Sequence, residues 1–268
     1  MSAVIFRGND RVEILSSQDR GLMYGDGLFE TLRASAADLP WWPLHWRRLQ
    51  EGALRLGLQL PDEALIHDAA KKLLDGRPQV LKIVLTRGES GRGYQPVAGP
   101  GTCILSSHAL PSAMPGRLSL HWCTTAVARQ PALAGLKHLN RLENVLARRE
   151  CTDAGHAEGL MSDCDGHVIC ATAANVFLYV NGCWLTPDLS QCGIAGIARA
   201  MLLTLLPDIR VSAVTRPQLE NAEAVFLCNA VRGIMAVHQV GSVPVAGHAA
   251  LDALKQRFLD AHPFFANE

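Results

Sequence analysis

The sequence predicts an α+β protein of two domains. Apolar stretches between turn residues predict strands, and segments with apolar residues at helical spacing predict helices, without the regular alternation of a parallel α/β fold. The 268 residues, 49% of them hydrophobic, suffice for two medium-sized cores. The stretch HALPSAMPG at 108–116 contains two prolines and a glycine and is the best linker candidate. We expect a small N-terminal domain at 1–110, a linker at 111–116 and a larger domain at 117–268.

The strands are expected where short runs of apolar and β-branched residues lie between turn signals. The turn signal Gly8-Asn9-Asp10 separates the first two, and a glycine-rich turn precedes the third. In chain order we expect strands at 4–6, 12–15, 27–34, 79–86, 102–106, 118–124, 159–161, 167–169, 175–180, 183–186, 225–228 and 235–240, with a strand–helix unit at 209–220.

Helices are expected where apolar residues recur three and four positions apart. A helix at 43–58 should end near Gly57, and one at 61–74 has proline in its first turn and Gly76 after its end. The remaining helices are expected from about 140, from about 197 and at 249–259.

Composition narrows the possible partners. Formal net charge is zero and basic residues do not form long runs, so a nucleic-acid partner is not expected. No apolar run reaches the roughly 18–20 residues of a membrane span, and charges near the N-terminus argue against a signal peptide. The eight cysteines are scattered without CxxC spacing, which favours reduced thiols in the cytoplasm over a disulfide framework or a metal site. We expect a cytoplasmic protein that acts on a small molecule.

Lys137 in the stretch GLKHLNRLENV is the first candidate for chemistry. Asn140 followed by Glu143 reads as a capping box, so a helix should begin near Asn140 with Lys137 just before it. The positive end of a helix and desolvation both disfavour an ammonium group and lower the pKa of a lysine. A neutral amine is what Schiff-base chemistry requires. The alternative is an ordinary surface lysine in a loop.

Three other stretches could bind a ligand. GIAGIAR, residues 193–199, opens a helix whose first N–H groups could hold an anion, although any tight strand-to-helix turn can look alike. Arg48 in HWRR shares a helix face with His45 and could grip a phosphate, or it could be a solvated arginine. RGLMYGDGLFET and RGESGRGY are glycine-rich loops of the kind that often binds ligands, or simple hairpins.

Together and in this order, the motifs resemble the class IV, branched-chain-type aminotransferase superfamily of pyridoxal-phosphate enzymes. The residues that carry the resemblance are YGDGLFET, HWRRL, LKHLNRLENV, the run from Asp165 to Phe177 that contains AANVF, and GIAGIAR. The resemblance implies the two-domain fold type IV, as in D-amino-acid aminotransferases, with pyridoxal 5′-phosphate as cofactor and a homodimer as assembly.

The resemblance also implies roles for single residues. Lys137 would form the Schiff base with the cofactor and act as acid and base. The cofactor phosphate would be held by Arg48 and by the start of the helix at Gly196, Ile197 and Ala198, where Ala198 replaces a frequent threonine. Asn229 would lie near the phosphate. The substrate residues would be Tyr24, Arg92 and Tyr94.

One position departs from the family pattern. A glutamate that pairs with the pyridine nitrogen is expected five residues before Asn175, and this chain has Cys170 there. A thiol cannot supply the negative charge that makes the ring a strong electron sink. Either the register differs locally, or the enzyme is impaired, or its reaction does not need a full sink.

Within the superfamily, GRGY paired with LKHLNRLE is most similar to the aminodeoxychorismate lyase family. The implied reaction converts 4-amino-4-deoxychorismate to p-aminobenzoate and pyruvate through an external aldimine, in folate biosynthesis. Aromatisation drives that reaction, so Cys170 favours a lyase. The alternatives are a D-amino-acid or branched-chain aminotransferase and an inactive paralogue that binds pyridoxal phosphate.

Overall fold

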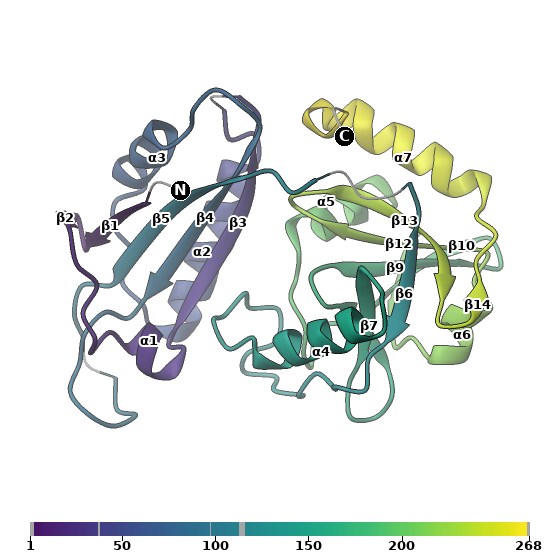
Figure 1. Cartoon of the computed structure of the whole chain (residues 1–268), viewed down its shortest axis with the longest axis horizontal. Coiled ribbons are helices and arrows are strands. Elements are labelled where there is room, and N and C mark those ends of the chain that lie inside the picture. Colours follow the sequence, from purple (N-terminus) through teal and green to yellow (C-terminus); the bar gives the residue numbers. More distant parts are fainter. Residues whose placement is uncertain (1–2, 37, 97, 113–115, 267–268) are drawn as a thin grey trace. The chain divides into compact units, whose positions relative to one another are not determined.

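The computed structural model of the chain divides into two compact units (Figure 1). It describes residues 3–36, 38–96, 98–112 and 116–266. The first unit is Met1–Pro111 with Lys137–Asn140, and the second is Ser112–Leu136 with Arg141–Glu268. The segment of Lys137 therefore groups with the first unit, whereas the sequence placed it in the C-terminal domain. Residues 113–115 of the expected linker lie outside the described residues.

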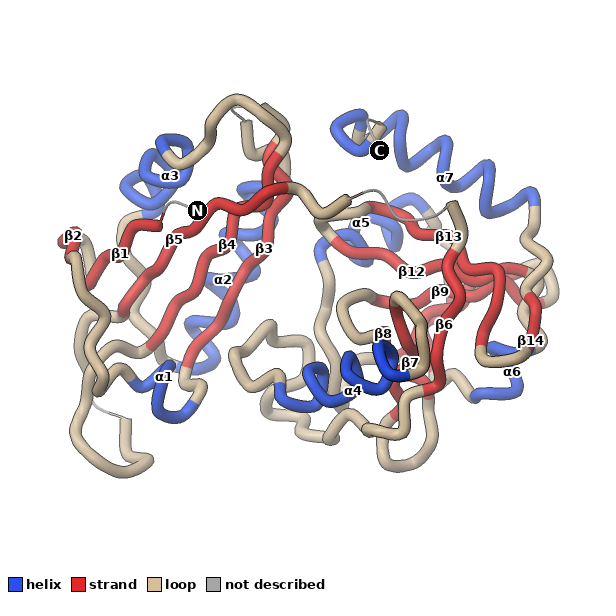
Figure 2. Tube along the Cα trace, viewed as in Figure 1, coloured by secondary structure: helices blue, strands red, loops and turns tan. Residues whose placement is uncertain are grey.

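The first unit is built on an antiparallel five-stranded sheet in the order β2–β1–β5–β4–β3. Its strands are β1 (Ala3–Arg7), β2 (Asp10–Val12), β3 (Gly27–Ala34), β4 (Gln79–Thr86) and β5 (Thr102–Ala109). Figure 2 shows these strands side by side in red. The predicted ranges of β3 and β4 agree with the structure to the residue, because turn residues bound both apolar runs.

The helices of the first unit are α1 (Arg20–Tyr24), α2 (Trp42–Leu56) and α3 (Glu63–Lys72). α2 contacts β3, and α3 contacts β5. Alternate residues of β4, namely Leu81, Ile83 and Leu85, are at most 1% exposed and form the core of this unit. α2 ends at Gly57, whose φ of 63° requires the left-handed conformation that glycine adopts without strain.

The second unit is built on a mixed nine-stranded sheet, with main order β11–β10–β9–β12–β13–β6–β7–β8 and β14 paired to β13. Its strands are β6 (Leu118–Trp122), β7 (Glu158–Ser162), β8 (Val168–Ala171), β9 (Asn175–Val180), β10 (Cys183–Pro187), β11 (Arg210–Ser212), β12 (Ala224–Asn229), β13 (Gly233–Val240) and β14 (Val243–Pro244). β6 runs parallel to both β13 and β7, while most other pairs are antiparallel. The mixture confirms the α+β class.

The helices of the second unit are α4 (Leu142–Asp153), α5 (Ile197–Leu205), α6 (Arg216–Glu220) and α7 (Ala249–Ala261), followed by a 3-10 turn, η1 (Pro263–Phe265). The core of the sheet includes Phe177 and Phe226, whose stacked rings lie 4.7 Å apart. In the described part of the chain, we find no helix with the length and apolar character of a membrane span.

α4 turns its large apolar residues outward. Leu142, Val145 and Leu146 are 78%, 60% and 44% exposed, although their helical spacing is typical of the apolar face of an amphipathic helix. The helix instead contacts β6 and β7, and its buried residues are Ala147 and Cys151. The small side chains of Ala147 and Cys151 allow this close approach. The apolar stripe that the helical periodicity indicates does not pack against other residues of the described chain.

Candidate functional site

Lys137 lies along the free edge of β3. The backbone N–H of Phe29 donates to the Lys137 carbonyl at 2.9 Å, and the N–H of Leu139 donates to the Gly27 carbonyl at 3.0 Å. The Lys137 side chain is partly buried, and its Nζ lies 4.1 Å from the centroid of the Phe29 ring, a cation–π distance. Backbone pairing and the ring together fix the position of the amine.

The residues before Lys137 are tied to the glycine-rich loop of the second unit. Gly135, at φ 79°, donates its N–H to the Gly193 carbonyl at 2.9 Å and accepts from the N–H of Ala195 at 3.1 Å. Gly135, two residues before Lys137 in the chain, is therefore bonded through its backbone to the loop that is predicted to bind an anion.

The capping box predicted at Asn140 is wrong. α4 begins two residues later, at Leu142, and Arg141 is its N-cap without a side-chain bond. Asn140 uses its Nδ2 to donate to the Gly25 carbonyl at 3.2 Å, and Glu143 accepts from the N–H of Ala128 at 3.1 Å. A helix dipole acts mainly within the first turn. The helix start therefore does not explain the placement of Lys137, and its contacts with β3 do.

A buried charged cluster lies beneath β3. Glu30 is 1% exposed, and its carboxylate accepts from Nε of Arg48 at 2.7 Å and from Nη2 at 2.5 Å. His45, also 1% exposed, places its Nδ1 2.6 Å from the same carboxylate. Arg48 and His45 are one turn apart on α2, as predicted, but Glu30 was not predicted as the partner that bonds to both. The carboxylate fixes the guanidinium in one orientation.

The protonation states in this cluster follow from its charges. Burial raises the pKa of Glu30, but the charge of Arg48 and the hydrogen bonds from Arg48 and His45 outweigh burial and lower it to about 2. Burial lowers the pKa of His45, and this effect, together with the charges of Arg48 and Lys137, outweighs the Glu30 carboxylate, which raises the pKa. Glu30 is therefore a carboxylate and His45 a neutral imidazole that donates through Nδ1. Its buried Nε2 then carries a lone pair and has no hydrogen-bond partner among the described residues, so it can accept a hydrogen bond but cannot donate one.

The stability of the protein should fall in acid through Glu30. The pKa of Glu30 is lowered from 4.5 to about 2 in the folded protein, so its carboxylate stabilises the fold fully above pH about 4.5. This stabilisation is lost as the pH falls from about 4.5 to about 2. About 2 kcal/mol should be lost by pH 3 and about 3 kcal/mol by pH 2. Urea titrations at pH 7, 5 and 3 measure it. A Glu30→Gln variant, which has no proton to bind here, should show a smaller acid loss; equal losses would contradict the assignment.

α5 offers an uncapped helix start in the second unit. Gly196 is its N-cap and makes no side-chain cap bond, while Ile197 and Ala198 begin the helix in buried positions. A Cβ on Gly196 would lie 2.1 Å from Oδ1 of Asn175, so only glycine fits. The first N–H groups of a helix carry partial positive charge and can bind a phosphate. The predicted phosphate residues therefore form a suitable local structure.

Cys170 lies in β8 and is 8% exposed. It belongs to an apolar cluster that includes Met161, Ile169, Leu189 and Cys192. Burial raises the pKa of its thiol to about 12, so the thiol is neutral at neutral pH. A ligand atom beside Cys170 would therefore face a neutral thiol.

Asn229 ends β12, and its side chain is occupied by backbone groups. Its Oδ1 accepts from the N–H groups of Val231 at 3.0 Å and Arg232 at 2.8 Å, and its Nδ2 donates to the Ala173 carbonyl at 3.2 Å. These bonds shape the turn between β12 and β13. The structure shows a structural role for this amide.

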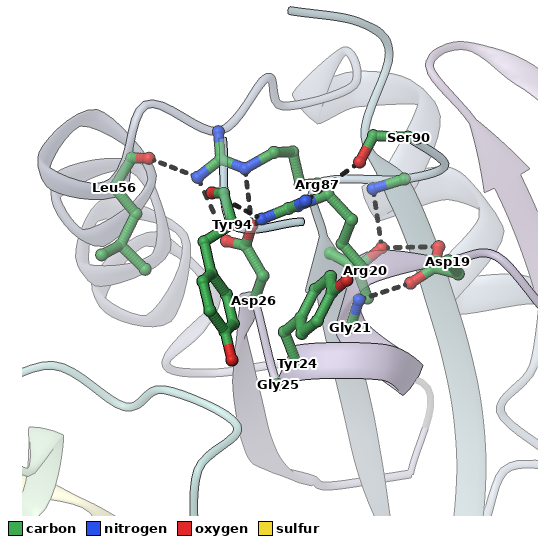
Figure 3. A network of polar contacts seen from close by, with 12 residues as sticks. Asp19, Arg20, Gly21, Tyr24, Gly25, Asp26, Leu56, Arg87, Ser90 and Tyr94 are labelled. Carbon is green, nitrogen blue, oxygen red and sulfur yellow. Dashed lines mark hydrogen bonds and ion pairs between the residues drawn. The ribbon is translucent and has the colours of Figure 1, made fainter. Parts of the chain in front are cut away.

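The three predicted substrate residues lie near one another in the first unit. The Tyr24 hydroxyl accepts from the N–H of Gly93 at 3.3 Å, and the rings of Tyr24 and Tyr94 meet edge to face at 5.6 Å. Tyr94 is 86% exposed, and Arg92 is exposed as well. Arg20 bonds to the loop that carries Arg92 and Tyr94, and it shares the Asp26 carboxylate with Arg87 (Figure 3). No motif in the sequence predicts these bonds.

One further group of polar residues lies in the turn before β8. Asp163, Asp165 and His167 bring their ligand atoms within 4.8 Å of one another. Arg129 forms ion pairs with both carboxylates. This cation supplies the charge that balances the two acids, so we assign no function to the group.

Comparison with known proteins places these features in a family. The Amino-transferase class IV family model matches residues 27–240. The crystal structure of 4-amino-4-deoxychorismate lyase from Pseudomonas aeruginosa superposes with a TM-score of 0.87 at 39% identity, covering 96% of this chain and 99% of that one.

Two curated relatives differ in their activities. An aminodeoxychorismate lyase of Vibrio harveyi is 33% identical over 235 residues, 84% of this chain and 86% of that protein. A D-alanine aminotransferase of Bacillus licheniformis is 27% identical over 259 residues, 92% of this chain and 91% of that protein.

Proposed function

The chain belongs to the class IV aminotransferase family of pyridoxal-phosphate enzymes, and we propose that it is an aminodeoxychorismate lyase. The observation that carries the proposal is similarity to two such lyases over most of the chain, at 39% and 33% identity. The reaction would convert 4-amino-4-deoxychorismate to p-aminobenzoate and pyruvate.

The described residues fit the cofactor of this family, pyridoxal 5′-phosphate. The amine of Lys137 is partly buried and fixed on Phe29. Arg48 in the first unit and the uncapped start of α5 at Ile197 and Ala198 in the second are each suited by their local structure to bind a phosphate. The bound cofactor supplies an aldehyde that combines with amines and a ring that withdraws electrons from the attached carbon.

Lys137 would do two things in the reaction. Its Nζ would hold the cofactor while no substrate is bound and would become a free amine when the substrate amine replaces it. The free amine then accepts the proton from the ring carbon that bears the substrate nitrogen, as a general base. As that C–H bond breaks, the carbon–oxygen bond to the enolpyruvyl group breaks too, and the ring becomes aromatic. The enolate of pyruvate would leave and take up the proton held by Lys137, which restores the free amine.

Cys170 supports a lyase over an aminotransferase. The thiol is neutral because burial raises its pKa to about 12, so it cannot stabilise a protonated pyridine ring as a carboxylate would. Transamination depends on a carbanion that survives long enough to be protonated elsewhere. Elimination with aromatisation needs a shorter-lived carbanion, so it tolerates a weaker sink.

Replacing Cys170 by glutamate is expected to add transaminase activity. Glutamate restores a carboxylate, so amino-group transfer from D-alanine to 2-oxoglutarate should rise at least about tenfold over the wild type. The matched control is Cys170→Gln, which has nearly the same size and packing but no charge. The ¹⁵N chemical shift of labelled cofactor reports protonation of the ring nitrogen independently of activity. Identical shifts and activities in the two variants would contradict the role of Cys170.

Incubation with aminodeoxychorismate tests the proposed function. The holoenzyme should release p-aminobenzoate and pyruvate in equal amounts, with no keto acid or amino donor added. An aminotransferase would instead need an amino donor and a keto acid. The similarity to a D-alanine aminotransferase keeps this second function open. A protein that binds cofactor but gives neither product would be an inactive paralogue.

A homodimer in the cytoplasm completes the proposal. The outward apolar stripe of Leu142, Val145 and Leu146 on α4 supports an assembly, because such surfaces are commonly covered by a partner. All eight cysteines are free, in keeping with a reducing compartment. Light scattering should give twice the chain mass of 29.0 kDa; the mass of a single chain would contradict the dimer.

A further inference from the structure

Arg20 is a buried cation whose side chain is only 4% exposed. Its Nε donates to Oδ2 of Asp26 at 2.8 Å, which supplies the counter-charge. Its Nη1 donates to Oγ of Ser90 at 3.0 Å and to the Gly93 carbonyl at 2.9 Å, and its Nη2 donates to the Tyr94 carbonyl at 3.2 Å. One guanidinium group therefore binds three residues of the loop that carries Arg92.

Tyr24 holds the same loop from the adjacent helix. Its hydroxyl accepts from the N–H of Gly93, and its ring meets the Tyr94 ring edge to face (Figure 3). The Arg20 guanidinium lies 4.8 Å from the centroid of the Tyr24 ring. Gly93 is thus bonded through both its N–H and its carbonyl, which fixes the peptide that follows Arg92.

The base of the loop is held without the Arg20 side chain. The hydroxyl of Thr86 donates to Oδ2 of Asp19 at 2.8 Å and accepts from the N–H of Gly88 at 3.0 Å. The backbone N–H of Arg20 donates to the Gly88 carbonyl at 2.9 Å. Loss of the guanidinium should therefore free Ser90–Tyr94 and leave the start of the loop in place.

Arg87 also bonds to the Asp26 carboxylate, but its other hydrogen bonds go to the end of α2. It donates to Asp26 from Nε at 2.7 Å and from Nη2 at 3.1 Å. Its remaining bonds, at 2.7 and 2.8 Å, go to the carbonyls of Leu56 and Gly57 at the end of α2. Arg87 therefore provides a control with the same counter-charge and similar burial that, among the described residues, makes no hydrogen bond to Ser90–Tyr94.

We propose that Arg20 is a positioning residue that holds Ser90–Tyr94 in one conformation, so that Arg92 and Tyr94 are presented to a carboxylate-bearing substrate. Arginine suits this task because its planar group donates five hydrogen bonds in fixed directions, whereas lysine has three from one atom. Arg92 is exposed and can pair with a substrate carboxylate. Only the substrate part of this inference rests on the proposed function.

Limited trypsin digestion of the holoenzyme tests the loop directly. Trypsin cleaves after arginine, and the bond between Arg92 and Gly93 lies in the exposed loop that Arg20 restrains. Arg20→Lys should be cut there at least about tenfold faster than the wild type, because several hydrogen bonds are lost. Arg87→Lys should be cut at the wild-type rate. Equal rates in the two variants would overturn the inference.

A milder variant covers the case in which Arg20→Lys does not fold. Tyr24→Phe removes only the hydroxyl that accepts from Gly93, so cleavage after Arg92 should accelerate by about fivefold. Cleavage at the wild-type rate in this variant would also count against a restrained loop.

Steady-state kinetics test the link to substrate. In Arg20→Lys, KM for aminodeoxychorismate should rise about tenfold while kcat stays within about twofold, because the loop binds substrate and takes no part in proton transfer. Arg87→Lys should change neither constant. Faster cleavage with an unchanged KM would overturn the substrate part. A wild-type protein that makes no p-aminobenzoate but shows the predicted cleavage pattern would refute the proposed function and leave the restraint by Arg20 intact.

Discussion

Replacing Lys137 by alanine is expected to lower the release of p-aminobenzoate by about a thousandfold or more. The variant loses both the amine that binds the cofactor and the base that accepts the substrate proton, and general base catalysis alone contributes about 10²–10⁴-fold. The fold should survive, because the backbone of residue 137 supplies the bond to Phe29. The measurement is the single-turnover yield of product from enzyme loaded with cofactor.

Lys82 provides the matched control for this prediction. Its Nζ lies 5.5 Å from the centroid of the same Phe29 ring that Lys137 contacts. Lys82→Ala removes a nearby positive charge of the same kind and should keep activity within about threefold, as for an exposed group outside the site. Comparable losses in the two variants would show that charge near Phe29, and not the amine of Lys137, sets the rate.

Replacing Glu30 by glutamine is expected to cost about 3 kcal/mol of unfolding free energy. The amide keeps the size of the side chain but removes the charge that Arg48 and His45 share in a buried site. Breaking one partner of a buried ion pair typically costs about 3–5 kcal/mol. Urea denaturation at pH 7 measures the change through the midpoint at constant slope.

Glu89 is the control for an exposed pair. It contacts Arg7 at 3.1 Å, and both side chains are more than a third exposed. Glu89→Gln should change stability by about 0–1 kcal/mol, since surface ion pairs contribute little. If Glu30→Gln were no more destabilising than this variant, the buried cluster would not stabilise the fold as described.

Strands and glycine-rich motifs could be predicted because their signals are local. β3, β4 and β9 agree with the sequence prediction to the residue, since turn residues bound each apolar run. α1 was missed because a five-residue helix with a glycine in its first turn has no helical periodicity. Its cap, in which Asp19 accepts from the N–H of Gly21, is recognisable only in the structure.

Tertiary contacts overrode local rules at α4. Asn140 and Glu143 have the spacing of a capping box, yet each side chain bonds to a distant backbone group. Residue 137 consequently pairs with β3, more than a hundred positions earlier in the chain. Local sequence cannot show such competition, because both partners of each bond must be known.

The charged networks could not be predicted for the same reason. Arg20 bonds to residues 70 to 74 positions away, and Glu30 binds arginine and histidine from another element. In the sequence alone, Arg20 is an ordinary charged residue next to a glycine, and Glu30 is a charged residue within a strand. An acid within an apolar strand was the one available signal, since a buried carboxylate at Glu30 requires cationic partners.

Borohydride reduction of the holoenzyme followed by peptide mapping tests the central claim that Lys137 is the amine that binds the cofactor. Reduction fixes the cofactor to that amine, and trypsin does not cleave after a modified lysine. The cofactor mass should therefore appear on the peptide from Gln130 to Arg141 and be absent in Lys137→Ala. Cofactor fixed to another lysine, or to none, would contradict this assignment.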